Sequence, residues 1–216
     1  KEGLKITNNT LIKAPVGSGK STLISKDIID YREEKKDYRP VLILSSTAFL
    51  TKHQYLTFSE ALKGQKCKVL NRIADKKNLK KRSVITLTYA ALSVIIKFDP
   101  NFLDNFSMVY CDEVHSLLDY NSYGKSDLNI LIRDLFILRE KTKVIYLTAT
   151  TDIIEKYAKK EEGFSELYSK MNVIDLMNRP DIIKYEAKRT HSFSCLETLQ
   201  TAVRSSRVDF IINLVN

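Results

Sequence analysis

A run of small residues around one lysine has the composition of a phosphate-binding loop. The run Ala14-Pro15-Val16-Gly17-Ser18-Gly19-Lys20-Ser21-Thr22 follows an apolar stretch and precedes an amphipathic one. Phosphates need closely spaced backbone N–H groups, small side chains and the partial positive charge of a helix N-terminus. We therefore predict that Lys20 reaches the outer phosphates and that the Ser21 hydroxyl ligates Mg²⁺. The predicted nucleotide-binding set is Pro15, Val16, Gly17, Ser18, Gly19, Lys20, Ser21 and Thr22.

This loop departs at one position from the strict pattern GxxxxGK[ST]. Ala14 stands where that pattern has its first glycine. The alternative interpretation is a glycine-rich turn between a strand and a helix, with an incidental lysine. The apolar stretch before the loop and the helical pattern after it favour the phosphate-binding interpretation.

Two adjacent acids follow a second apolar stretch. Asp112 and Glu113 come directly after residues 108–111, and Lys20 lies 92 residues before Asp112. Beside a triphosphate, Asp112 can hold Mg²⁺ through its water shell, while Glu113 orients and deprotonates the attacking water. Alone, such a pair is more often a solvated strand end or a helix cap, and the upstream loop favours the catalytic interpretation. The predicted catalytic residues are Glu113, Asp112 and Lys20, and the predicted metal ligands are Ser21 and Asp112.

A third candidate site is the run Thr148-Ala149-Thr150, which ends another buried apolar stretch. Threonines in this position usually cap the following helix, here one expected near Asp152. The run gains functional meaning only in combination with the phosphate loop and the acid pair.

Short apolar runs alternate with longer amphipathic ones along the chain, which predicts an α/β fold with a doubly wound, mostly parallel sheet of the P-loop NTPase type. Continuous apolar runs such as VLIL are typical of strands buried on both faces. In such sheets ligands bind at the carboxyl ends of the strands, where all three candidate sites fall. The predicted strands are 10–14, 41–45, 68–70, 84–89, 108–111, 143–147 and 173–176, and the predicted helices are 20–32, 51–62, 90–98 and 128–139.

The order of these motifs resembles the superfamily 2 helicases and translocases, specifically their DExH group. APVGSGKST would be motif I, the DEVH of residues 112–115 motif II, and the TAT of residues 148–150 motif III. The resemblance implies a RecA-like domain that binds ATP and Mg²⁺, with DNA or RNA as partner. It also implies that His115, Thr148, Ala149 and Thr150 couple the nucleotide to the rest of the motor. Motifs Ia and Ib would contact the nucleic-acid backbone and correspond to Ser45, Ser46, Thr47, Thr88 and Tyr89.

The domain organisation follows from the same resemblance. We expect residues 1–180 to form the first RecA-like domain, ending at Pro180, and residues 181–216 to form a connector strand and helix. The connector would lead toward a second RecA-like domain that is absent from this chain. In this family the second domain supplies the arginine fingers, so we expect these residues alone to hydrolyse ATP slowly.

Lysine and arginine outnumber aspartate and glutamate by 35 to 26, a net charge of +9 over 216 residues that suggests a polyanionic partner. Much of the excess falls between residues 66 and 82, and we predict that Lys76, Lys77, Lys80 and Lys81 contact nucleic acid beside motif Ib. The alternative is a solvated basic loop. Three well-separated cysteines and the lack of a membrane-length apolar run indicate an intracellular protein, cytoplasmic or nucleoid-associated, with no membrane partner.

Two other functions remain open at this stage. The chain could belong to a translocase that moves on duplex DNA without separating strands, as restriction and remodelling enzymes do. It could also be a nucleic-acid-binding module with a vestigial nucleotide site. The sequence does not distinguish DNA from RNA, or one oligomeric state from another.

Overall fold

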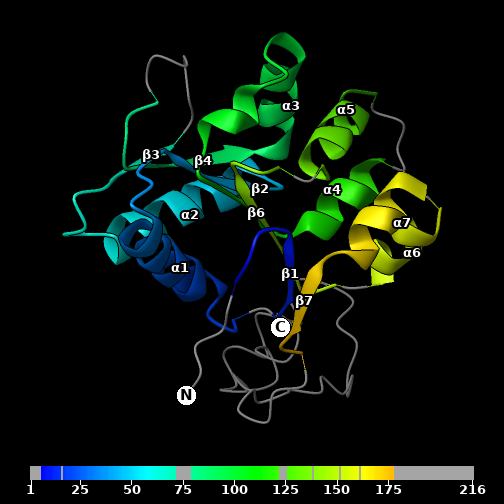
Figure 1. Cartoon of the computed structure of the whole chain (residues 1–216), viewed down its shortest axis with the longest axis horizontal. Coiled ribbons are helices and arrows are strands. Elements are labelled where there is room, and N and C mark those ends of the chain that lie inside the picture. The colour runs from blue at the N-terminus through cyan, green and yellow to red at the C-terminus, as the bar shows by residue number, and fades with distance from the viewer. Residues whose placement is uncertain are drawn as a thin grey trace, which may run out of the picture. The chain divides into compact units, whose positions relative to one another are not determined.

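The computed structural model describes residues 6–15, 17–71, 79–121, 126–137, 139–150, 152–160 and 162–177. These residues form a seven-stranded sheet in the order β3-β4-β2-β5-β6-β1-β7, in which every neighbouring pair is parallel (Figure 1). The strands are β1 (Thr10–Lys13), β2 (Val41–Ser45), β3 (Lys68–Asn71), β4 (Ser83–Thr88), β5 (Met108–Cys111), β6 (Lys143–Thr148) and β7 (Asn172–Asp175). The predicted α/β fold with a doubly wound parallel sheet is confirmed, and each predicted strand is present within one or two residues.

Helices cover both faces of this sheet. They are α1 (Lys20–Lys35), α2 (Ala48–Ala61), α3 (Tyr89–Phe98), α4 (Val114–Asn121), α5 (Ser126–Leu135), α6 (Asp152–Lys160) and α7 (Glu162–Ser169). A short 3₁₀ helix, η2 (Phe102–Asn105), precedes β5. The four predicted helices are α1, α2, α3 and α5, although α5 ends four residues earlier than expected. No helix in the described part of the chain is both long enough and apolar enough to cross a membrane.

Alternate side chains of each central strand belong to two separate cores. In β2, Val41 and Ile43 pack with α1 and α2, whereas Leu42 and Leu44 pack on the opposite face with α3, α4 and α5. All four side chains are fully buried, which is why the strand reads as an uninterrupted apolar run. Figure 1 shows α1 and α2 grouped together and the later helices gathered elsewhere around the sheet.

The parallel strands place all their carboxyl ends at one edge of the sheet. The phosphate loop follows β1, the acid pair follows β5 and the Thr148 run ends β6. Because β1 and β5 both pair with β6, these three segments lie side by side. The predicted boundary at Pro180 and the predicted connector of residues 181–216 lie outside the described residues.

Candidate functional site

The loop between β1 and α1 requires glycine at two positions. Gly17 and Gly19 have φ angles of 76° and 83°, in the left-handed region that residues with a Cβ rarely adopt. A Cβ added to either would meet no atom within 4 Å, so the space beside both glycines is open. Gly19 is also the N-cap of α1 and provides no side-chain cap, which leaves the first N–H groups of the helix available to a ligand. Val16 lies outside the described residues.

Lys20 connects this loop to the acid pair. Its Nζ lies 3.0 Å from Oε1 of Glu113 and 3.5 Å from the carbonyl oxygen of Ala14. The lysine side chain is 13% exposed and the glutamate side chain 21%, so the ion pair is partly shielded from water. Two motifs that are 93 residues apart in the sequence therefore meet in one site. Ser21 and Thr22 follow on the first turn of α1.

Asp112 is held by three neighbouring groups, two of them at its carboxylate. Gln54 donates from Nε2 to Oδ2 over 2.7 Å, and the backbone N–H of Glu113 donates to Oδ1 over 3.1 Å. The hydroxyl of Tyr89 donates to the Asp112 carbonyl oxygen over 2.9 Å. Burial, followed by the negative charge of Glu113, raises the pKa of Asp112, while Lys20 and Gln54 oppose that rise.

Glu113 differs from Asp112 in its backbone conformation and in the hydrogen bonding of its carboxylate. Its φ of 49° is in the left-handed region, an uncommon conformation for a residue with a Cβ that concentrates at functional sites. Its Oε2 is buried without a hydrogen-bond partner among the described residues, although it lies 3.3 Å from Nδ1 of His115. A carboxylate oxygen left in this state can accept a proton or orient a water molecule.

His115 links the acid pair to the end of β6. Its Nδ1 lies 3.0 Å from Oγ1 of the fully buried Thr148. That hydroxyl also donates to the carbonyl oxygen of Thr150 over 2.8 Å and accepts from the Thr150 N–H over 3.0 Å. Because the hydroxyl proton is directed at Thr150, Nδ1 of His115 carries the hydrogen in this contact. Ala149 is half-buried within the resulting turn, which thus connects to the acid pair through His115.

The comparisons with known proteins agree with this geometry. The family model of the DEAD/DEAH box helicases matches residues 2–157, which is well over half of the chain. The chain belongs to the DEAD/DEAH box helicase family. Two solved structures have the same fold: the Pyrococcus furiosus Hef helicase domain and a variant of S. cerevisiae Dbp5 bound to RNA and ADP BeF3.

The similarity to these two structures is one of fold. The Hef domain is 22% identical with a TM-score of 0.56, over 83% of this chain and 39% of that one. The Dbp5 variant is 19% identical with a TM-score of 0.58, over 79% of this chain and 42% of that one. This chain thus spans about two fifths of the length of either, and its fold is that of an N-terminal RecA-like helicase domain.

In this DEAD/DEAH box domain, the residues predicted to contact nucleic acid have different surroundings. Ser45 is buried and its Oγ lies 2.6 Å from Oγ1 of Thr51. Thr47 and Thr88 are the N-caps of α2 and α3, where they accept from the N–H groups of Leu50 and Ala91. Ser46 is half-buried beside Thr47.

Tyr89 is the one aromatic residue in these predicted contacts, and its ring is not exposed to a nucleic acid. The side chain is only 3% exposed, and its hydroxyl is bonded to the backbone of Asp112. The ring belongs to the apolar core under α3, so no base can stack on it. Its position supports the acid pair instead.

An exposed aromatic residue on the same side of the helicase domain was not predicted. Phe49, in the first turn of α2, is 78% exposed and lines a pocket of about 750 Å³ between α2 and α3. Lys52, Asn71 and Thr88 also line this pocket. The spacing of Thr51, Gln54 and Phe58 defines the buried face of α2, and that spacing could have shown that Phe49 points away from the core.

The structure places Lys80 and Lys81 away from motif Ib, so their predicted position beside it is wrong, while their contact with nucleic acid stays a prediction. They directly precede β4, whereas Thr88 ends it, and a six-residue strand separates these points by about 17 Å. Because β3 and β4 are parallel, the segment between them returns to the amino ends of the strands. The basic residues are therefore at the end opposite to the phosphate loop. Lys76 and Lys77 lie outside the described residues.

Proposed function

We propose that this domain binds ATP with Mg²⁺ and hydrolyses it as part of a nucleic-acid-dependent motor of the DExH group. The observation that carries the proposal is the 3.0 Å contact between Nζ of Lys20 and Oε1 of Glu113. That contact brings the phosphate loop and the acid pair to one point at the carboxyl edge of a parallel sheet, where nucleotides bind in folds of this class.

The residues around this contact suit a magnesium nucleotide. The open space beside Gly17 and Gly19 and the uncapped N-terminus of α1 can receive the phosphates. Ser21 and Asp112 would hold Mg²⁺, which when bound would neutralise charge on the phosphate oxygens. A cation beside Asp112 would also stabilise the ionised carboxylate and so oppose the rise in pKa that burial causes.

Lys20 and Glu113 would change partners when nucleotide binds. In the free domain each neutralises the other at 3.0 Å. A triphosphate attracts the lysine more strongly than one carboxylate does, so Lys20 would turn to the outer phosphates. Glu113 would then have both carboxylate oxygens available, and it would orient the attacking water and accept its proton.

His115 supports assignment to the DExH group rather than to another group of the family. Its side chain lies between Oε2 of Glu113, at 3.3 Å, and Oγ1 of Thr148, at 3.0 Å. A change in the charge around Glu113 would therefore act directly on the turn formed by residues 148–150. We propose that this turn carries the state of the nucleotide to the second RecA-like domain of the parent protein.

The nucleic acid, DNA or RNA, would lie across the N-termini of α2 and α3. Ser46 and Thr47 precede α2, Thr88 precedes α3, and Phe49 and Lys52 are in the pocket between them. Helix N-termini bind backbone phosphates, and an exposed ring can stack on a base. The Dbp5 variant with the same fold is bound to RNA, which is consistent with this placement.

The proposal is tested by ATP turnover of the parent protein with a panel of single- and double-stranded DNA and RNA. Glu113→Gln should lower the stimulated rate by about 10²- to 10⁴-fold, because it removes the general base. Glu60→Gln, an equivalent change on the exposed face of α2, is the matched control and should leave the rate unchanged. Stimulated turnover that survives in Glu113→Gln would contradict the assigned role. A strand-displacement assay beside a triplex-displacement assay on the parent protein would separate unwinding from translocation on duplex DNA.

A further inference from the structure

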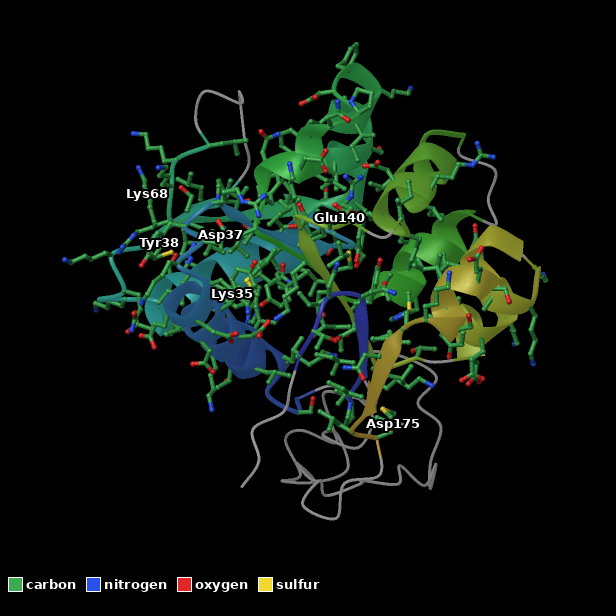
Figure 2. The ribbon with its side chains drawn as sticks, in the orientation of Figure 1. Lys35, Asp37, Tyr38, Lys68, Glu140 and Asp175 are labelled. Carbon is green, nitrogen blue, oxygen red and sulfur yellow. The ribbon has the colours of Figure 1, made fainter. Side chains whose placement is uncertain are left out.

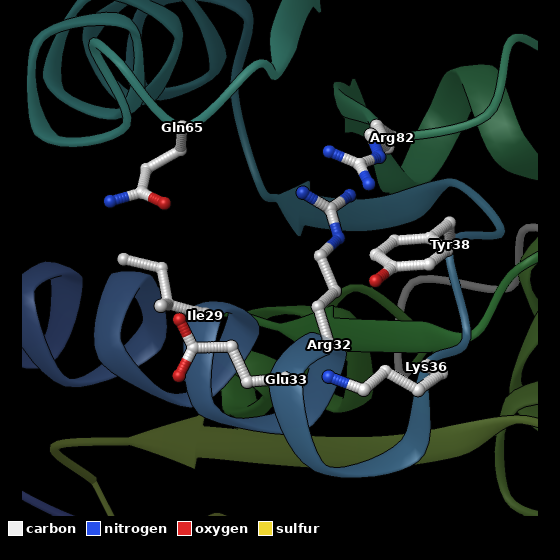
Figure 3. Close-up of a pocket in the computed structure, with 7 residues that line it drawn as sticks. All are labelled: Ile29, Arg32, Glu33, Lys36, Tyr38, Gln65 and Arg82. Carbon is white, nitrogen blue, oxygen red and sulfur yellow. The ribbon is translucent and has the colours of Figure 1, made fainter.

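A second pocket lies at the amino ends of the strands, away from the nucleotide site. It has a volume of about 150 Å³ and is bounded by the last turns of α1, the loop after α1 and the residue before β4 (Figure 3). The side chains that matter most are three cations, Arg32, Lys36 and Arg82, together with Tyr38 and Gln65. Glu33 is the one acid among the residues that line it.

Arg32 is a buried cation that pairs with no carboxylate in the part of the chain that the structure describes. Its side chain is 8% exposed, and its Nη2 reaches only the carbonyl oxygen of Ser83, at 3.3 Å, while Nη1 lies 3.5 Å from Sγ of Cys67. Its Nε has no hydrogen-bond partner, and it forms no ion pair with a carboxylate of the described residues. The nearby carboxylate of Asp37 is instead bound to Arg39, with Nη2 and Oδ2 2.7 Å apart. A buried unpaired charge is costly, and an anion in the pocket would remove that cost.

Arg82 and Lys36 face the same pocket from two sides. The Arg82 guanidinium carbon lies 4.2 Å from the centre of the Tyr38 ring, which fixes its plane. Figure 3 shows the guanidinium groups of Arg32 and Arg82 turned toward the same space, with the Gln65 amide across from them. Lys36 is the C-cap of α1. The C-terminus of a helix disfavours anions, and three cations outweigh that effect.

We propose that this pocket binds a phosphate group. Two guanidinium groups and an ammonium group match phosphate oxygens in both charge and hydrogen-bond geometry. The exposed Lys80 and Lys81 immediately precede Arg82, so the positive charge continues beyond the pocket. Lys68, labelled in Figure 2, adds to it, because it pairs in register with Ser83. The phosphate can belong to a nucleic-acid backbone or to a small phosphorylated molecule. The proposal is independent of the nucleotide site at the other end of the sheet.

The test is a titration of the ¹⁵N-labelled chain followed by amide NMR spectra at constant ionic strength. The first titrant is inorganic phosphate and the second is a single-stranded RNA oligonucleotide. The backbone signals of Lys36, Gln65 and Arg82 report this pocket, whereas that of Gly19 reports the phosphate loop separately. Lys36→Gln and Arg82→Gln each remove one cation from the pocket. Lys35→Gln, one residue away and paired with Glu34 outside the pocket, is the matched control.

We expect the pocket signals to shift in a saturable way and each pocket variant to bind roughly three- to fivefold more weakly, with no change in the control. A response to inorganic phosphate alone would identify a small phosphorylated ligand. The concentration of the oligonucleotide is counted in phosphate groups. A response at a much lower concentration than inorganic phosphate requires would identify a nucleic-acid backbone. Pocket signals that respond to neither titrant, or an equal loss of binding in Lys35→Gln, would overturn the proposal, whatever the Gly19 signal shows.

Discussion

Asp112 and Glu113 are neighbours in the sequence with different surroundings in the fold. Asp112 is held by Gln54 and by the N–H of Glu113, which suits a fixed metal ligand. Glu113 has one oxygen paired with Lys20 and another with no hydrogen bond to the residues that the structure describes, which suits a group that moves a proton. Two adjacent carboxylates can thus take separate roles because their environments differ.

Replacing Asp112 with asparagine should make the free chain more stable near neutral pH. Because burial raises the pKa of Asp112 in the folded state, ionising it costs folding free energy. That cost is absent below the unfolded-state pKa of about 3.9 and complete above the folded-state pKa. The stability advantage of Asp112→Asn should therefore increase from pH 4 to pH 7 in urea denaturation. Asp30→Asn, on the exposed face of α1, is the control. A stability advantage of Asp112→Asn that decreases with rising pH would contradict the account.

The residues that meet in the candidate site were predictable where a short motif identifies them. Lys20, the acid pair and His115 were found from their spacing and their position after apolar runs. Gln54 and Phe49 were missed because their importance depends on the rotation of α2, which decides that one faces Asp112 and the other faces solvent. No local pattern relates Gln54 to an acid 58 residues later.

At the scale of elements, α2 and α3 begin in the same way. Thr47 and Thr88 each accept a hydrogen bond from the N–H three residues later. Thr47 follows β2 by two residues, and Thr88 is the last residue of β4. Both hydroxyls are thus engaged in capping, and phosphates would have to be bound mainly by the remaining N–H groups of the two helices.

Two substitutions at Thr47 should separate capping from nucleic-acid binding. Thr47→Ala should cost about 1 kcal/mol of folding stability, because the cap of α2 is lost. Thr47→Asp keeps a side-chain acceptor at the cap but adds a negative charge at the proposed nucleic-acid face, so it should retain stability and weaken binding. Thermal denaturation and binding to a labelled oligonucleotide measure the two effects. Equal oligonucleotide affinity of Thr47→Asp and wild type would exclude this face.

The elements themselves were predictable to different degrees. Strands buried on both faces appear as continuous apolar runs, and all of those described were found. The eight-residue helices α4 and α7 were not predicted, because they are too short to show a helical period. The early end of α5 was missed because no glycine or proline marks it.

At the scale of the whole molecule, the parallel sheet separates two sets of charges. The proposed nucleotide site and the N-termini of α2 and α3 are at the carboxyl ends, and the pocket around Arg32 is at the amino ends. Lys80 and Lys81 were assigned to the wrong end because composition gives the amount of charge but not its position in the fold. The parallel pairing of β3 with β4 determines at which end of the sheet the residues before β4 lie. The sequence alone does not show which strands pair.

The isolated chain should bind ATP but hydrolyse it slowly. The arginine fingers expected from a second RecA-like domain are typically worth about 10³- to 10⁵-fold in rate. Single-turnover hydrolysis by these 216 residues, with and without single-stranded RNA, measures this. Fast turnover that nucleic acid stimulates would mean that the chain already contains a complete catalytic site.

The most direct test of the account is the binding of ATP and Mg²⁺ to the isolated chain, measured by calorimetry. We expect saturable binding that is lost in Lys20→Ala, because this substitution removes the cation that connects the phosphate loop to the acid pair. Lys26→Ala, an exposed lysine on the same helix, should bind as wild type does. Equal affinity of Lys20→Ala and wild type, or no binding by the wild type, would contradict the account.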